Sequence, residues 1–361
     1  MVIISIFQKL KSLLRKKDEF YGTDKQNSLL SQINDRLEGF NPFYKPKIDF
    51  PHITFGIEIE FKVDESKVND LLESLLKNKL CYEQQVLERD RAKSVDGWKL
   101  SKETNGAYEI ISPVLQDLEV HWSQISFICK RLNDIGAITD EDCAFHVHIG
   151  SKAFSQGRHW INLRNIYRNM EPLTYLLSAG TNESIPKKRI EHYAVPLIIA
   201  DKSLYRRVYS INEVLTKIEN DEDKDYILTS LYAGRFVGLN LSNLSKKSKT
   251  IEFRTFNSTF DPALIQTYIV YVASIINKAV DENFELDKNF NAINYEISKS
   301  TGSKVRLNPL YILNCLAAII MDSIIKNSLL WYMKQNNFEI PLYVYDVIQG
   351  KLSDEKRKQL L

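Results

Sequence analysis

The stretch 55–61 (Phe-Gly-Ile-Glu-Ile-Glu-Phe) constrains this chain more than any other, because apolar residues alternate strictly with Gly or Glu. This period of two predicts a β-strand with one apolar face and one polar face. Glu58 and Glu60 share the polar face, about 7 Å apart along the strand. Two carboxylates at this spacing repel each other unless a cation lies between them. Taken alone, the pair also fits a solvated strand face with two surface acids.

Length and composition predict a folded protein with a substantial core. The chain has 361 residues, 44% of them hydrophobic, and only 13 glycines and 10 prolines. A net charge of +2 is too small to create a positive electrostatic field that would attract nucleic acid, so no nucleic-acid partner is expected. The cysteines stand singly, without metal or disulfide spacing, which favours a reducing, cytoplasmic location. No transmembrane segment is expected, because the most apolar run, 310–321, is too short.

The two ends of the chain differ in character from its middle. Residues 1–20 form a basic amphipathic pattern, which favours either a helix on a membrane surface or partner, or a helix or tail beside the protein body. Nothing in this run is typical of a signal peptide. Residues 21–50 are polar and then rich in proline and aromatic residues, and are interpreted as a linker. We therefore expect three regions: an N-terminal segment and linker 1–50, a central domain 51–280 and a C-terminal helical region 281–361.

A second strand pattern, 143–150, carries two histidines. Its apolar residues predict a buried face, while His146 and His148 share the opposite face. Same-face histidines are typical of metal or phosphate sites, although a structural or surface pair also fits. If these histidines join the acids of the first strand, the set is rich in oxygen ligands and suits Mg²⁺ or Mn²⁺ more than zinc.

Further segments place charged residues on strand patterns. Glu109 lies on a short apolar strand that a proline ends, and Asp96 lies in a turn beside another strand. In 250–256, Glu252 and Arg254 share one face. This pair fits a surface ion pair of small energy. Alternatively, the acid binds a cation and the guanidinium holds a phosphoryl group through paired N–H bonds.

Together these patterns predict strands and helices that bring the charged residues to one place. Polar residues alternate with apolar ones in each strand, as one face of an antiparallel sheet requires if its carboxylates and imidazoles are to converge. The expected strands are 53–63, 94–100, 108–114, 143–150, 234–241 and 250–256. The expected helices are 65–80, 117–135, 158–179, 262–280, 309–335 and 353–360.

In their order along the chain, these motifs resemble the amidoligase family, carboxylate–amine ligases of the glutamine synthetase and glutamate–cysteine ligase superfamily. The resemblance runs from about residue 55 to residue 276. It is carried by Phe55-Gly56-Ile57-Glu58-Ile59-Glu60, Asp96, Glu109-Ile110-Ile111-Ser112-Pro113, Phe145-His146-Val147-His148-Ile149-Gly150 and Ile251-Glu252-Phe253-Arg254. Lys188-Arg189-Ile190 with Tyr193 is a weaker similarity to a basic segment of the superfamily.

The resemblance implies an α+β fold of the glutamine synthetase-like type. In this fold, helices pack on the outer face of a curved antiparallel sheet, and the C-terminal helices form an appendage. ATP is implied on the concave side with two or more Mg²⁺ (or Mn²⁺) ions. The implied metal ligands are Glu58, Glu60, Glu109, His146 and Glu252.

The resemblance also implies roles for five other residues. His148 is expected beside the nucleotide phosphates, and Arg254 is expected to assist phosphoryl transfer. Arg189 and Arg235 are expected to bind phosphate or the substrate carboxylate, the first as a cofactor-binding and the second as a catalytic residue. Asp96 is expected to face the amine.

The implied reaction joins a carboxylate to an amine at the expense of ATP, through an acyl phosphate. The substrates are expected to be small molecules or peptides. The oligomeric state is left open, although superfamily members often assemble into homo-oligomers. Two alternatives remain open. One is a kinase-like member of the superfamily that only transfers phosphate, and the other is a non-catalytic scaffold on the same fold.

Overall fold

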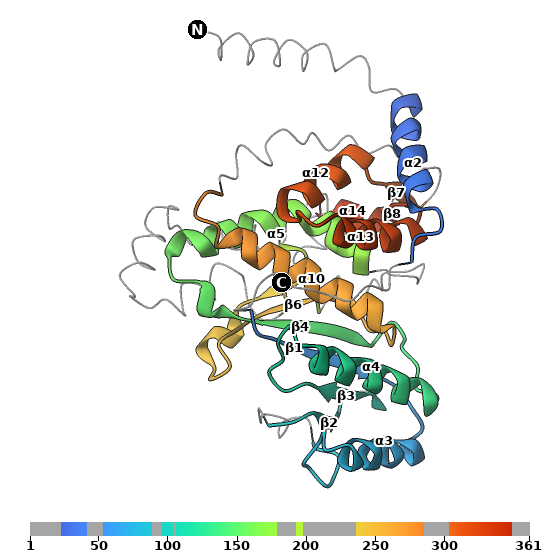
Figure 1. Cartoon of the computed structure of the whole chain (residues 1–361), viewed down its shortest axis with the longest axis vertical. Coiled ribbons are helices and arrows are strands. Elements are labelled where there is room, and N and C mark those ends of the chain that lie inside the picture. The colour runs from blue at the N-terminus through green and yellow to red at the C-terminus, as the bar shows by residue number, and fades with distance from the viewer. Residues whose placement is uncertain are drawn as a thin grey trace, which may run out of the picture.

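The computed structural model describes residues 23–41, 53–88, 96–103, 106–178, 193–197, 236–284 and 303–348. Several expectations lie outside these ranges: the basic segment 1–20, Arg189, Arg235 and the helix at 353–360. Within the described residues, a six-stranded sheet is combined with eight α-helices, which is an α+β architecture (Figure 1).

The sheet has the strand order β2-β3-β1-β4-β6-β5, and every neighbouring pair is antiparallel. It therefore confirms a strand in each expected segment, although the bounds differ. β1, β3 and β5 are shorter than predicted, most of all β5 with two residues, and β2 begins and ends later than predicted. The bounds are β1 Phe55–Phe61, β2 Lys99–Lys102, β3 Tyr108–Ile111, β4 Ala144–Gly150, β5 Leu239–Asn240 and β6 Thr250–Asn257.

One face of the sheet is apolar and is covered by helices. Along β1, fully buried residues alternate with partly exposed ones, as the sequence pattern predicts. Aromatic rings join the strands to the helices: Phe55 stacks on Trp122 of α4, and Phe145 packs against Tyr268 of α10. The charged residues that alternate with this apolar set are therefore on the opposite face of the sheet.

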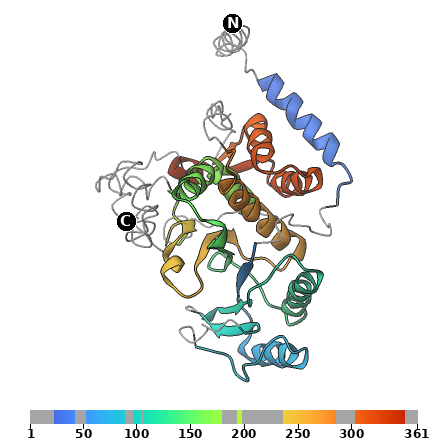
Figure 2. The ribbon, with the colours of Figure 1, turned by 60° about the vertical axis from the view of Figure 1, so that its left-hand side comes forward.

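Four helices match those predicted from apolar spacing. They are α3 Glu65–Lys77, α4 Glu119–Asp134, α5 Gly157–Ser178 and α10 Pro262–Ala279. Helices α5 and α10 lie side by side over the sheet (Figure 2). The Asp261 side chain accepts hydrogen bonds from the amides of Ala263 and Leu264, and Pro262 is the first helical residue, so α10 begins where the sequence predicts.

The interpretation of residues 21–50 as a linker is wrong for part of this range, because Thr23–Leu37 forms helix α2. Its apolar residues Leu30, Ile33 and Leu37, spaced by three and four positions, are buried. The helix contacts α12 Pro309–Ile319 and α13 Ser323–Gln335. Burial of this narrow stripe outweighs the polar composition that led to the linker interpretation.

The C-terminal part packs against the helices of the sheet. The helical pattern at 309–335 forms two helices, α12 and α13, because Asp322 caps a new helix through the amide of Ile325. Helix α13 contacts α10 and α5. The remaining elements are β7 Lys304–Arg306, its antiparallel partner β8 Glu339–Pro341, and α14 Leu342–Ile348.

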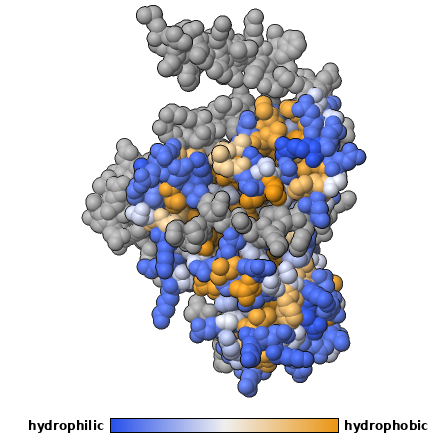
Figure 3. All heavy atoms as spheres, viewed as in Figure 1, coloured by the Kyte–Doolittle hydropathy of each residue, from blue (hydrophilic) through white to orange (hydrophobic). Residues whose placement is uncertain are grey.

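The cysteines and the surface of the described residues agree with the composition. Cys81, Cys129, Cys143 and Cys315 are all free and buried. On the face shown in Figure 3, hydrophilic residues predominate among the described residues, and hydrophobic residues appear between them in patches. Among the described residues, no helix combines the length and the apolar character that crossing a membrane requires.

Candidate metal centre

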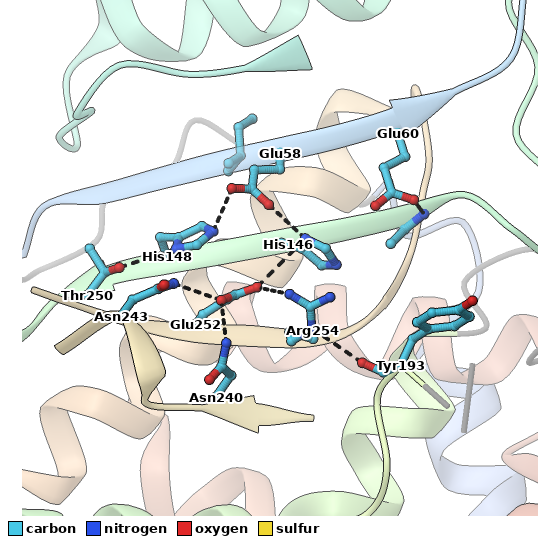
Figure 4. A network of polar contacts seen from close by, with 12 residues as sticks. Glu58, Glu60, His146, His148, Tyr193, Asn240, Asn243, Thr250, Glu252 and Arg254 are labelled. Carbon is cyan, nitrogen blue, oxygen red and sulfur yellow. Dashed lines mark hydrogen bonds and ion pairs between the residues drawn. The ribbon is translucent and has the colours of Figure 1, made fainter. Parts of the chain in front are cut away.

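Charged residues from neighbouring strands lie next to one another on the polar face of the sheet (Figure 4). The register pairs Glu58 with His146, and it pairs His148 with Glu252. Because cross-strand partners lie on the same face, the pairing itself brings acids and imidazoles together. A register irregularity between Phe145 and Val147 interrupts the β4–β6 ladder beside this set.

Glu58 contacts both histidines. Its Oε2 lies 2.7 Å from Nδ1 of His146, and its Oε1 lies 3.0 Å from Nε2 of His148. Burial opposes ionisation of this carboxyl, but the charge of His148 and hydrogen bonds to both histidines hold the pKa of Glu58 well below its usual range. Glu58 is therefore a carboxylate over a wide range of pH.

His148 is held from both sides of its ring. Its Nδ1 lies 3.2 Å from the hydroxyl of Thr250, while its other nitrogen faces Glu58. Burial disfavours protonation of this imidazole, but the neighbouring charges of Glu58 and Glu252 outweigh burial and raise the pKa of His148. The two carboxylates thus favour a positive charge at this point of the sheet.

Glu252 is almost fully buried and still carries its charge. Its Oε1 accepts a hydrogen bond from Nη1 of Arg254 and lies 3.8 Å from Nδ1 of His146. Its Oε2 accepts hydrogen bonds from the side-chain amides of Asn240, at 2.7 Å, and Asn243, at 2.8 Å. Burial opposes ionisation, but the charges of Arg254 and both histidines lower the pKa of Glu252.

Arg254 is the arginine of this network and lies at the side of β6 that faces the segment 193–197. Its Nε donates a hydrogen bond of 3.3 Å to the backbone carbonyl of Tyr193, which fixes one side of the guanidinium. Glu252 holds the other side. A planar guanidinium held in this way has a fixed orientation, as recognition of a phosphate or carboxylate requires.

Glu109 behaves in the opposite way to Glu58. It is buried on β3, opposite Glu60 on one neighbouring strand and Ser101 on the other. Burial and then the charges of Glu58 and Glu60 raise the pKa of Glu109 well above its usual range. Without a bound cation, this site therefore favours a protonated Glu109.

Among the described residues, two groups of side chains have ligand atoms within 4.8 Å of one another. Each contains two carboxylates and one imidazole, and Glu58 belongs to both. The groups are Glu58 with His148 and Glu252, and Glu58 with Glu109 and His146. A majority of oxygen ligands fits Mg²⁺ or Mn²⁺. The raised pKa values of His148 and Glu109 also fit, because both show that the site favours added positive charge.

Not every expected site residue lies in these groups. Glu60 accepts a hydrogen bond of 2.8 Å from the backbone amide of Ala144, and it is in neither group. His148, expected beside the nucleotide phosphates, is in one of them. Asp96 is exposed in the turn before β2 and is in neither group. Arg189 and Arg235 lie outside the described residues.

Sequence reasoning missed three residues of the network: Asn240, Asn243 and Thr250. Asn240 stands between Leu239 and Leu241 in a strand pattern, so its position on the polar face could have been predicted from alternation. The position of Asn243 depends on the turn after β5, for which the sequence carries no simple pattern.

The fold and the site together define an α+β protein whose antiparallel sheet gathers candidate cation ligands on one face. Residues 51–276 match the family described as "Putative amidoligase enzyme", and the chain belongs to this family. The family name denotes enzymes that form amide bonds. No curated protein matches the sequence.

Replacing Glu109 by glutamine should stabilise the cation-free protein at alkaline pH. An acid with a raised pKa holds its proton in the folded state after the unfolded chain has lost it, so stability falls as pH rises through the folded-state pKa. Glutamine removes this loss. We expect the melting temperature of Glu109→Gln in EDTA to exceed that of the wild type by about 2–4 °C at pH 8. The difference should shrink at pH 5, and an equal or opposite difference at both pH values would contradict this account.

Proposed function

We propose that this protein is an ATP-dependent ligase that joins a carboxylate to an amine through an acyl phosphate. The observation that carries the proposal is the convergence of two groups of carboxylate and imidazole ligands, both containing Glu58, beside the fixed guanidinium of Arg254. Membership of the amidoligase family supports the same class of reaction.

Mg²⁺ or Mn²⁺ ions, bound with ATP, would neutralise phosphate charge as it redistributes during transfer. The residues that would hold them are Glu58, Glu60, Glu109, His146 and Glu252. His148, which forms a group with Glu58 and Glu252, would lie beside them. Each acid must be ionised and each imidazole neutral to act as a ligand. Cation binding would therefore displace the protons that His148 and Glu109 retain in the cation-free site. Glu60 contributes a further negative charge on the same face of the sheet.

In the first step, an oxygen of the acid substrate attacks the γ-phosphorus of ATP, and the bond from that phosphorus to the bridging oxygen breaks to give ADP and an acyl phosphate. Arg254 would bind the transferring phosphoryl group through its guanidinium. In the second step, the amine attacks the acyl carbon, the bond from that carbon to the phosphate oxygen breaks, and the amine proton is lost. An amide and inorganic phosphate remain.

The amine must be neutral to attack, so a carboxylate near it promotes the second step. We assign this role to Asp96, which is exposed at the β2 end of the sheet. His148 would approach the nucleotide phosphates, and Arg189 and Arg235 would bind phosphate or the substrate carboxylate. The glutamine synthetase-like form of the sheet and the division into regions 1–50, 51–280 and 281–361 remain parts of this proposal.

The direct test is mass spectrometry of a metabolite and peptide pool incubated with the full chain, ATP and Mg²⁺. We expect a new product lighter by one water than the sum of an acid and an amine, formed together with ADP and phosphate. The product should be absent with Arg254→Ala and with EDTA. A stable phosphorylated product without any amine would favour the kinase-like alternative, and no ATP binding would favour a scaffold.

A further inference from the structure

The turn that follows β5 holds Glu252 from the side opposite Arg254. Asn240 is the last residue of β5, and Asn243 lies in the short 3₁₀ helix Ser242–Ser245. Both asparagines are buried, and both donate their side-chain N–H to Oε2 of Glu252, at 2.7 Å and 2.8 Å (Figure 4). We call residues 240–246 the amide clamp.

Each amide of the clamp is oriented by a donor of its own. The backbone N–H of Ser242 donates to Oδ1 of Asn240 at 2.9 Å. The ammonium group of Lys246 donates to Oδ1 of Asn243 at 2.5 Å. Because each carbonyl oxygen is held by a donor, each NH₂ group must point the other way, toward the carboxylate. The orientation of both amides is therefore built into the turn.

The clamp divides the two oxygens of Glu252 between different tasks. Oε2 accepts two amide hydrogen bonds in a buried position, whereas Oε1 faces Arg254 and His146. A buried carboxylate oxygen that gave up two hydrogen bonds would leave two buried N–H groups unsatisfied, which is unfavourable. Oε1 is therefore the oxygen of Glu252 that can bind a further cation without breaking these two amide hydrogen bonds.

We propose that Asn240 and Asn243 are positioning residues, which hold Glu252 so that it binds a cation through Oε1 alone. This inference rests on the proposed function, because it assigns a metal ligand within the same site. The clamp would act through Glu252, to which both amides donate. The β5–β6 ladder pairs the backbones of Asn240 and Glu252, so the sheet does not depend on these amides.

Mn²⁺ binding to the purified full chain, measured by EPR spectroscopy, tests the inference. We expect Asn243→Ala and Asn240→Ala each to weaken Mn²⁺ binding by about 10- to 100-fold, the usual effect of losing a partner that orients a metal ligand. Asn78→Ala is the control, because Asn78 donates its amide to the carbonyl of Ser74 on α3, away from the sheet. In kinetic assays, the Mg²⁺ concentration for half-maximal activity should rise more than kcat falls.

Lys246→Met is a second test that does not disturb the buried residues, because Lys246 is exposed. It removes the donor that orients Asn243 and should weaken Mn²⁺ binding by less than Asn243→Ala does. Lys247→Met is its matched control, because it removes the same charge from the neighbouring exposed position. The inference would be overturned if both asparagine variants and Lys246→Met bound Mn²⁺ as tightly as the wild type does. Failure of the wild type itself to bind Mn²⁺ would instead overturn the proposed function.

Discussion

Arg254→Ala is expected to reduce Mg²⁺-dependent formation of ADP by about 10³-fold or more, as loss of a transition-state arginine does in other phosphoryl-transfer enzymes. The guanidinium is held between Glu252 and the carbonyl of Tyr193, so its plane has a fixed direction before ATP binds. ADP formation in the presence of the substrate pool measures the effect. Affinity for ATP should change less than turnover, because the interaction strengthens as charge moves during transfer.

Two variants make this prediction specific. Arg254→Lys keeps the charge but loses the paired N–H geometry, so it should recover only a small part of the activity. Arg158→Ala is the control, because this arginine is largely exposed and pairs with Glu282 at 3.8 Å, away from the site. If Arg254→Ala kept wild-type turnover while remaining folded, Arg254 would have no part in phosphoryl transfer.

Glu58→Gln should have the second large effect, because Glu58 belongs to both ligand groups. Glutamine keeps the size of the side chain but removes its charge. We expect turnover at a fixed Mg²⁺ concentration to fall by more than about 100-fold. This loss is larger than the usual effect of removing a residue that only orients a metal ligand. Measurements over a range of Mg²⁺ concentrations separate lost cation affinity from lost catalysis.

The same substitution should lower stability, in contrast to Glu109→Gln. An acid with a depressed pKa contributes stability above its unfolded-state pKa and loses it as pH falls through the folded-state pKa. Glu58→Gln removes that contribution, so its melting temperature in EDTA should lie below that of the wild type at neutral pH. Glu73→Gln, on the exposed face of α3, is the control and should leave both stability and turnover unchanged. If turnover of Glu58→Gln depended on the Mg²⁺ concentration as turnover of the wild type does, Glu58 would not be a ligand shared by the two groups.

The alternation of apolar and polar residues predicted the strands of the site well, because each strand has one face against helices. It correctly separated Glu58 from Ile57 and Ile59, and His146 from Val147. It did not define the register, which pairs Glu58 with His146 and depends on contacts between distant segments. Whether the converging residues act as metal ligands stays a prediction.

The sequence was less informative where tertiary contacts decide the structure. The resemblance implies Glu60 as a metal ligand, and this stays a prediction; no local pattern predicted that Oε2 of Glu60 accepts a hydrogen bond from the amide of Ala144. This contact forms beside the register irregularity at the start of β4, which no local pattern reveals. Helix α2 was missed for a similar reason. Its row of buried apolar residues is narrow, and its partners α12 and α13 are separated from it by about 300 residues of sequence.

A crystal structure of the full chain with Mn²⁺ and a non-hydrolysable ATP analogue, with Mn²⁺ located by anomalous diffraction, would test whether this face of the sheet binds metal and nucleotide. We expect anomalous peaks beside Glu58, His148 and Glu252 and beside Glu58, Glu109 and His146, with the nucleotide phosphates next to Arg254. Nucleotide and Mn²⁺ bound elsewhere on the protein, with no peak on this face of the sheet, would contradict this expectation.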